Sequence, residues 1–393
     1  MDLALHYSRF RVAERTLLTG HSHQAWPDVS FDAQQHAWLD AAALVDDKWE
    51  RAAAVADEVC RGWRRLLNDP DGDIALGQNT HELVVRLLSA LIAPAGRRRR
   101  LVTTDGEFHT IRRQLDRFAE AGVEVMKVPA RPVETLADRL TQHIDDRVAC
   151  VLMSSVLYET AEIVPYLAHV ADACAREGAE LLVDAYHQLN VVPFDVRALG
   201  LERAFITGGG YKYCQLGEGN CFLRVPPDCQ LRPVVTGWFS EFAELAEAKT
   251  PSEVRYGQGA ARFAGATYDP TAHYRAAAVF KFHQDLQLTP EQLREISRHQ
   301  VALLEDEIRA LDLDPSLAAI VELDPERRAG FLAVQTPHAV NFVRALRAHD
   351  VFADARGMVL RLGPAPYVSD GQLQTAAARL GQITRKLTRN PTL

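Results

Sequence analysis

The sequence lacks the features that mark membrane and secreted proteins. None of its 393 residues lies in a run approaching the roughly 20 apolar residues that a membrane-spanning helix needs. The N-terminal stretch lacks the basic start, apolar middle and small-residue cleavage site of a secretory signal. We therefore expect a cytoplasmic protein without a membrane partner.

Patterns for disulfides, metals and nucleic acids are also missing. The formal net charge of -8 gives no electrostatic reason to bind nucleic acid, and we expect the arginine run at 97–100 to be a solvated loop. The His21-x-His23 pair has no cysteine or carboxylate pattern nearby, so we expect no metal site. The six cysteines are scattered without CxxC or zinc spacing, which excludes a disulfide framework: Cys60, Cys150, Cys174, Cys214, Cys221 and Cys229.

The chain does contain alternating strand and helix patterns of ordinary globular composition, with 47% hydrophobic and 24% charged residues. Strands that alternate with helices predict parallel crossover units, so the main domain is α/β. Helical spacing of apolar residues is seen at 30–67, 111–121 and 166–177. A further helix is predicted to begin at Asn79-Thr80-His81. Six strands are expected, at 101–104, 123–128, 148–153, 181–184, 204–207 and 221–225.

After about residue 270 the pattern changes. Long helices at 274–287 and 290–311 precede short strands near 317–322, 331–335 and 359–362, and a last helix starts at about residue 370. This order predicts a smaller α+β domain. We expect residues 1–45 to be an N-terminal segment packing with it, residues 46–270 to form the large α/β domain, and residues 271–393 to form the small one.

The most informative segment lies between residues 180 and 213. Asp184 ends an apolar strand, and ligands of parallel sheets bind beyond such strand ends. The next strand runs into glycines 208–210, which let the backbone turn and approach a ligand, and then into Lys212. Alone, the aspartate is more often a cap and the lysine a solvated charge. Together, with His187 following Asp184, they are what pyridoxal 5'-phosphate needs: a carboxylate for its ring nitrogen and an amine for its aldehyde.

In these residues the chain resembles the fold type I pyridoxal phosphate enzymes of the class V aminotransferase group, and within it kynureninase. The resemblance implies a mostly parallel seven-stranded sheet covered by helices in the large domain. It also implies a homodimer with active sites at the interface. Four segments carry it, in the family's order: Asp184-Ala185-Tyr186-His187, Tyr211-Lys212-Tyr213, Val235-Thr236-Gly237-Trp238-Phe239, and the segment 360–367, which contains Arg361.

The resemblance implies a role for each catalytic residue. Lys212 would bind the cofactor aldehyde covalently and, once freed by the substrate, move the alpha proton. Asp184 would pair with the ring nitrogen, and His187 would support that hydrogen-bond network. Arg361 would hold the substrate carboxylate in a fork geometry, although an arginine in this pattern also fits a solvent-facing position.

Further residues would surround the cofactor and substrate. Phe108 would stack on the ring, with a core phenylalanine as the alternative. Asn79 and Thr80, at a helix start, suit a phosphate, although Thr80 equally suits a simple helix cap. Positions that match site residues of the family suggest the others. Ser154 and Tyr211 would bind the cofactor, His21 would line the substrate pocket, and Trp238 and Thr267 would contact both. Trp238 would reach in from a neighbouring subunit.

Three departures from the family fall at positions expected to recognise the substrate. Thr267 stands where kynureninases carry an asparagine, Ile111 where they carry an aspartate, and Gly20-His21-Ser22-His23 where they have a glycine-asparagine-serine-like turn. The resemblance therefore implies a kynureninase-like hydrolase acting on a small amino acid with a gamma carbonyl, which yields alanine and an acid. An aminotransferase is the runner-up; a sulfur-removing lyase and a cofactor-free binding protein are further alternatives.

Overall fold

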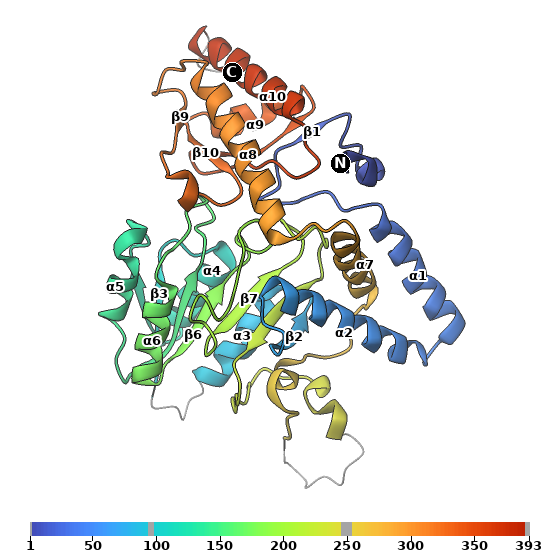
Figure 1. Cartoon of the computed structure of the whole chain (residues 1–393). Helices are drawn as coiled ribbons and strands as arrows, with labels where there is room; N and C mark the ends of the chain where they lie inside the picture. Colours follow the sequence, from blue (N-terminus) through green and yellow to red (C-terminus); the bar gives the residue numbers. More distant parts are fainter. Residues whose placement is uncertain (1, 93–97, 245–253, 390–393) are drawn as a thin grey trace.

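A seven-stranded sheet forms the centre of the larger part of the molecule in the computed structural model, which describes residues 2–92, 98–244 and 254–389 (Figure 1). Its neighbours are parallel except at β8, which runs antiparallel to β2 and β7. The expected mostly parallel seven-stranded sheet is confirmed. In spatial order the strands are β2 (Asp73–Gly77), β8 (Cys221–Val225), β7 (Phe205–Gly209), β6 (Glu180–Asp184), β5 (Val148–Ser154), β3 (Arg100–Thr104) and β4 (Glu124–Val128).

Helices bury both faces of this sheet. Along β5, Val151 and Met153 point into one core, and Cys150 and Leu152 point into the other, because successive side chains of a strand face opposite ways. One core lies under α2 (Lys48–Leu66), α5 (Leu136–Thr141), α6 (Leu167–Glu177) and α7 (Thr271–Asp285); the other lies under α3 (Thr80–Leu91) and α4 (His109–Glu120). α1 (Val29–Leu44) packs against α7.

The structure corrects two expectations for this region. β2 was not expected, because it is a five-residue edge strand whose apolar positions are few. The helical patterns expected over 30–67 form two helices, separated at Val45, whose φ is 53°. Gly208 and Gly209 belong to β7 rather than to a turn, and no glycine from 208 to 210 has a positive φ. A Cβ at Gly209 would collide with the Tyr186 ring, so close packing explains this glycine.

The C-terminal region forms a second, antiparallel sheet in the order β12 (Asp354–Arg356), β13 (Val359–Leu362), β10 (Leu332–Gln335) and β9 (Ala319–Ile320). Helices α8 (Pro290–Arg309), α9 (Ala339–Arg347) and α10 (Asp370–Arg389) pack with it. The α+β character expected for this region is confirmed. The strand expected near 317–322 is only two residues long, and β11 (Val351–Phe352) and β12 were not expected.

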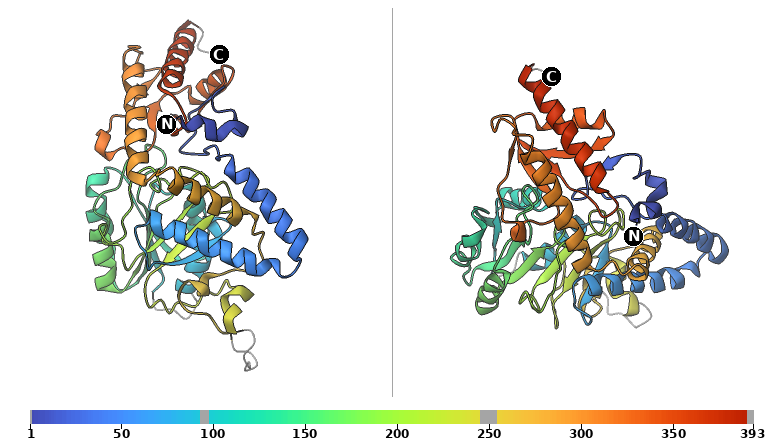
Figure 2. Two further views of the ribbon diagram at one scale, coloured as in Figure 1. Left: turned by 45° about the vertical axis from the view of Figure 1, so that its right-hand side comes forward. Right: turned by 45° about the horizontal axis from the view of Figure 1, so that its top comes forward.

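The N-terminal residues lie beside this smaller domain (Figure 2). β1 (Thr16–Leu17) pairs in parallel with β11, and Leu3 and Tyr7 join the core of the small domain. α7, in contrast, adds Val279 and Phe280 to the core of the large sheet. The boundaries at residues 45 and 270 remain predictions. Short 3-10 helices complete the chain: η1 (Leu3–Phe10), η2 (Val133–Thr135), η3 (Trp238–Glu244), η4 (Gly259–Phe263) and η5 (Pro325–Arg327).

Among the described residues, no helix combines the length and the apolar character that crossing a membrane requires.

Candidate active site

A cavity of about 430 Å³ opens where three parallel strands of the large sheet end. β5 and β6 end in register at Ser154 and Asp184, and the chain beyond β7 leads to Lys212. The volume lies within the range of about 300–1,000 Å³ that is typical of small-molecule sites. The residues from the predicted set that line it are Asn79, Thr80, Phe108, Asp184, His187, Tyr211 and Lys212. The fold therefore brings together side chains that lie more than a hundred positions apart in the sequence.

The Lys212 amine is buried in contact with His187. The distance between Lys212 Nζ and His187 Nε2 is 2.7 Å. Burial, together with the charges of Arg361 and Arg356, lowers the pKa of Lys212 to about 7, although the negative charge of Asp184 opposes this. Burial and the neighbouring Lys212 charge hold the pKa of His187 well below its ordinary value. At neutral pH the site thus holds an uncharged imidazole beside an amine of which a substantial fraction is neutral and able to act as a nucleophile.

The Asp184 carboxylate faces the same cavity. Its Oδ1 accepts a hydrogen bond of 2.8 Å from the backbone N–H of Tyr186, which fixes the orientation of the carboxylate. Burial raises the pKa of Asp184, and the Tyr186 N–H and the charge of Lys212 lower it. A cationic ring nitrogen placed here would stabilise the ionised form, since an opposite charge within a few ångströms favours ionisation.

Aromatic rings surround the amine. Lys212 Nζ lies 4.4 Å from the ring centroid of Tyr186, 5.2 Å from that of Phe108 and 5.6 Å from that of Tyr211. Phe108 directly precedes α4 and lines the cavity instead of joining a hydrophobic core, so the alternative of a core phenylalanine does not hold. Such rings exclude water and offer a flat apolar face to a planar ligand.

The N-terminus of α3 forms another wall of the cavity. Asn79 is its N-cap: the Asn79 side chain accepts a 2.9 Å hydrogen bond from the Glu82 N–H. The alternative of Thr80 as the cap is therefore wrong, because Thr80 is already the first helical residue. Backbone N–H groups and the helix dipole at such an end favour an anionic group.

Ser154 points elsewhere. Its hydroxyl donates a 2.7 Å hydrogen bond to Glu107 Oε2, its N–H donates to Glu107 Oε1, and it does not line the cavity. The predicted role of Ser154 in binding the cofactor is not supported by this geometry. Glu107 also accepts from Thr104, and burial raises the pKa of Glu107 to about 7. A glutamate beside an aromatic residue gave no signal in the sequence that it would be buried.

Arg361 and His21 meet at another carboxylate that the sequence did not point to. Both donate to Asp354: Arg361 Nε lies 2.9 Å and His21 Nε2 2.7 Å from Asp354 Oδ1. Arg361 is only 2% exposed, so the alternative of a solvent-facing arginine is wrong. Asp354 went unnoticed because it lies on a three-residue strand.

Trp238 and Thr267 lie apart from Lys212 within one chain. Thr267 lines a separate cavity of about 690 Å³ together with Phe239 and Arg86, and Trp238 is 45% exposed on η3. The single chain therefore does not bring these two predicted residues to its own cavity.

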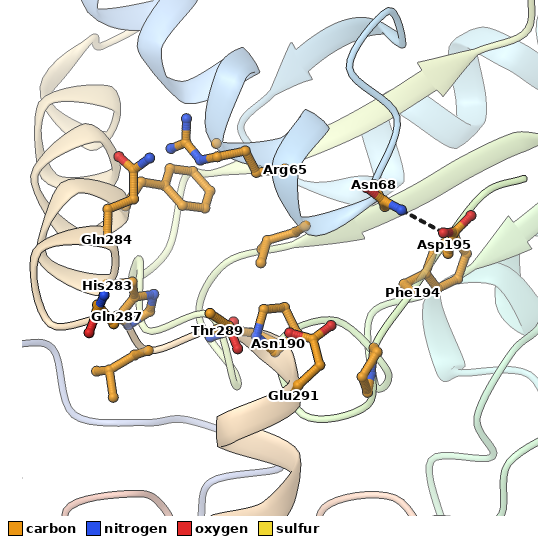
Figure 3. Close-up of a pocket in the computed structure, with 16 residues that line it drawn as sticks. Arg65, Asn68, Asn190, Phe194, Asp195, His283, Gln284, Gln287, Thr289 and Glu291 are labelled. Carbon is orange, nitrogen blue, oxygen red and sulfur yellow. Dashed lines mark hydrogen bonds between the residues drawn. The ribbon is translucent and has the colours of Figure 1, made fainter. Parts of the chain in front are cut away.

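A third cavity, of about 620 Å³, lies between the end of α2 and the junction of α7 and α8 (Figure 3). Asn68 donates a 2.5 Å hydrogen bond to Asp195 on one side of it, and His283 and Gln287 lie on the other. None of the predicted site residues lines it. Within the described parts of the chain, no group of three or more histidine, cysteine, aspartate or glutamate side chains is arranged to hold a metal ion.

Sequence comparisons associate the chain with kynureninases. Residues 293–380 match the family model of the kynureninase C-terminal domain. A kynureninase of Deinococcus radiodurans is 28% identical over 344 residues, which cover 85% of this chain and 79% of that protein. An uncharacterized aminotransferase of Bacillus subtilis, YcbU, is 22% identical over 94% of both chains.

Solved structures share the fold at low sequence identity. A C-DES mutant with glycine covalently linked to its PLP cofactor superimposes with a TM-score of 0.83 at 17% identity, covering 97% of this chain and 99% of that one. The cysteine desulfurase CsdA of Escherichia coli gives a TM-score of 0.79 at 16% identity, covering 98% of each chain. The chain thus has the fold of the fold type I enzymes and is kynureninase-like in sequence.

Proposed function

We propose that this protein is a hydrolase that cleaves the Cβ–Cγ bond of L-kynurenine, or of a related γ-oxo amino acid, to alanine and an acid. Its cofactor is pyridoxal 5'-phosphate. The observation that carries the proposal is that Lys212 and Asp184 line one cavity, which is walled by Phe108 and the start of α3. The kynureninase match of residues 293–380 supports the substrate class.

The residues in the cavity fit this cofactor. Lys212 would hold its aldehyde, Asp184 its ring nitrogen, Phe108 one face of its ring, and the N-terminus of α3 its phosphate. The buried His187 Nδ1 has no hydrogen-bond partner among the described residues, so it is available to a polar group of a ligand. When bound, pyridoxal 5'-phosphate supplies an electron sink for the carbanion that forms beside the substrate amino group.

The residues themselves provide the proton handling. With a pKa of about 7, the Lys212 amine takes up and releases a proton near neutral pH at Nζ, which suits general acid–base work. His187 stays neutral because burial, and then the neighbouring Lys212 charge, lower its pKa, so its Nε2 accepts a hydrogen bond from the protonated amine 2.7 Å away. Asp184 would pair with the ring nitrogen, and a positive charge there would favour the ionised form of the carboxylate.

The pH dependence of cofactor uptake follows from the pKa of Lys212. Only the neutral amine attacks an aldehyde, so the rate of uptake by the cofactor-free protein should rise with pH, pass half of its maximum near pH 7, and level off above that. Stopped-flow absorbance after mixing with pyridoxal 5'-phosphate measures this rate. A half-maximal rate near pH 10, the ordinary lysine value, would contradict the assigned environment of Lys212.

Turnover tests the substrate. Cofactor-loaded protein is incubated with L-kynurenine and with 3-hydroxykynurenine, and the fluorescence of anthranilate or 3-hydroxyanthranilate is followed together with the alanine released. We expect both products in equal amounts. Loaded protein that turns over neither compound would refute this substrate assignment, while the cofactor assignment would stand on its absorbance band.

An aminotransferase is the second candidate, favoured by the similarity to YcbU. It would use Lys212 and Asp184 in the same way but would leave the amino group on the cofactor. A single turnover without a keto acid separates the two, because a transaminase accumulates the amine form of the cofactor and a hydrolase does not.

The structural neighbours raise sulfur removal as a third candidate. Sulfur transfer to a protein thiol requires an accessible, readily ionised cysteine. None of the six cysteines is exposed, and burial raises the pKa of Cys214 and Cys221 well above the ordinary thiol value. These observations favour carbon–carbon cleavage over a mechanism with a cysteine persulfide on this chain.

A homodimer is part of the proposal. Trp238 and Thr267 lie outside the cavity of their own chain, and Val234, Val235 and Phe242 near Trp238 are exposed apolar residues. Exposed apolar groups of this kind mark interaction sites. We propose that a second copy covers them and receives Trp238 and Thr267 at its site. A monomeric mass in light scattering at micromolar concentration would refute this.

A further inference from the structure

Two arginines flank a single carboxylate on the small domain. In β12 and β13, Asp354 stands opposite Arg361, and the side chain of Arg356 follows on the same face because alternate residues of a strand point the same way. Arg361 donates through Nε and Nη2 to the two oxygens of Asp354. Arg356 Nη1 lies 3.4 Å from Asp354 Oδ2. The carboxylate thus lies between a bidentate partner and a looser one.

Arg361 is already engaged. Beyond its two bonds to Asp354, its Nη1 donates a 2.6 Å hydrogen bond to the Tyr158 carbonyl, and its side chain is buried. Hydrogen bonds from His21 and Arg361 hold the pKa of Asp354 below its ordinary value although burial opposes this, so Asp354 is ionised. The charge of Arg361 is therefore balanced inside the protein.

His21 does not alter this balance. It lies at hydrogen-bond distance from Asp354, but burial lowers the pKa of His21 to about 4, so it is neutral at physiological pH. The cluster of Arg361, Arg356 and Asp354 then carries one net positive charge. One carboxylate of a bound substrate would neutralise this positive charge, whereas two carboxylates would leave a net negative charge.

Arg356 is the arginine that remains available. Its side chain is 37% exposed, and its only hydrogen bond within the described chain is 2.8 Å long, from Nη1 to the carbonyl of Ala355. The cluster adjoins the cavity, because Arg361 donates to the carbonyl of Tyr158, whose ring centroid lies 5.4 Å from that of Phe108 and 6.5 Å from that of His187. In agreement with this placement, the charge of Arg356 contributes to lowering the pKa values of Lys212 and His187. The contacts of Arg356 with Ala355 and Asp354 both use Nη1, so the edge formed by Nε and Nη2 can receive a carboxylate in a fork geometry.

We propose that Arg356 is a second substrate-binding residue, which supplies the uncompensated charge for the α-carboxylate of the amino acid while Asp354 holds Arg361 rigid beside it. This rests on the proposed function, because it assumes an amino-acid substrate at Lys212. It follows that the site accepts α-amino acids with one carboxylate at this position and discriminates against amines without one.

A pair of probes that differ only in the carboxylate tests the inference. L-alanine and ethylamine are titrated into cofactor-loaded protein, and the shift of the cofactor absorbance band reports binding without requiring turnover. For Arg356→Gln we expect the affinity for L-alanine to fall roughly 10- to 100-fold, the range for losing a hydrogen bond between charged groups, while the affinity for ethylamine stays within about twofold. Arg356→Lys keeps the charge but loses the fork, so its affinity for L-alanine should lie between those of the wild type and Arg356→Gln.

The controls separate this inference from the parent proposal. Arg379→Gln changes an arginine that contacts Gln382 within α10, and it should leave both affinities unchanged. A wild-type protein that shows no band shift with L-alanine would refute the proposed function and the inference with it. If wild type prefers L-alanine over ethylamine and Arg356→Gln keeps that preference in full, the inference is overturned and the function stands.

Discussion

Replacing Lys212 by alanine should abolish the visible absorbance band of the cofactor and reduce turnover by at least about 10²- to 10⁴-fold, the contribution typical of a positioned acid–base group alone. Lys212 is the only amine that contacts His187 in the described structure, and it lies inside the cavity with Asp184. The measurement is an absorbance spectrum after gel filtration, followed by the kynurenine assay.

Lys281 provides the matched control for that experiment. It lies on α7 with a side chain that is 73% exposed, and among the residues that the structure describes it pairs only with Asp285, one helical turn away. Lys281→Ala should keep the band and the activity. A Lys212→Ala protein that retains a covalently linked cofactor after dialysis would show that another amine holds it, and the central assignment would be wrong.

Asp184→Asn should have the second-largest effect. The amide keeps the shape and can still accept from the Tyr186 N–H, but the negative charge that would pair with the ring nitrogen is lost. Removing one partner of a buried ion pair costs about 3–5 kcal/mol, which corresponds to a fall in turnover of about 10²- to 10⁴-fold. The kinetic assay on loaded protein measures this fall.

The same variant has a second signature that a merely unfolded protein would not give. The negative charge of Asp184 does most to raise the pKa of Lys212, so its neutralisation should move the half-maximal pH of cofactor uptake below 7. Asp138→Asn, an exposed aspartate on α5, should change neither turnover nor that pH. An upward shift in Asp184→Asn would contradict the electrostatic arrangement of the site.

The alternation of apolar runs with helical patterns was enough to predict an α/β sheet, because each buried parallel strand, such as β5, is a continuous apolar run. It did not reveal β2, whose short edge position needs few apolar residues, or the two-residue strands β1 and β11, which exist only because the N-terminal segment meets the small domain. Glycines 208 and 209 were interpreted as a turn, and only the neighbouring Tyr186 ring shows why they are small.

Local order along the chain by itself determined the part of the site closest to the chemistry. Asp184, His187 and Lys212 follow adjacent strands, and the carboxyl ends of adjacent parallel strands necessarily lie together. Tertiary structure alone decided the rest: that Ser154 turns to Glu107, that Asp354 binds Arg361 closely and Arg356 more loosely, and that Trp238 and Thr267 lie outside the cavity of their own chain. Hydrogen bonds between residues distant in sequence depend on how the two domains pack, and such contacts produce no periodic pattern in the sequence.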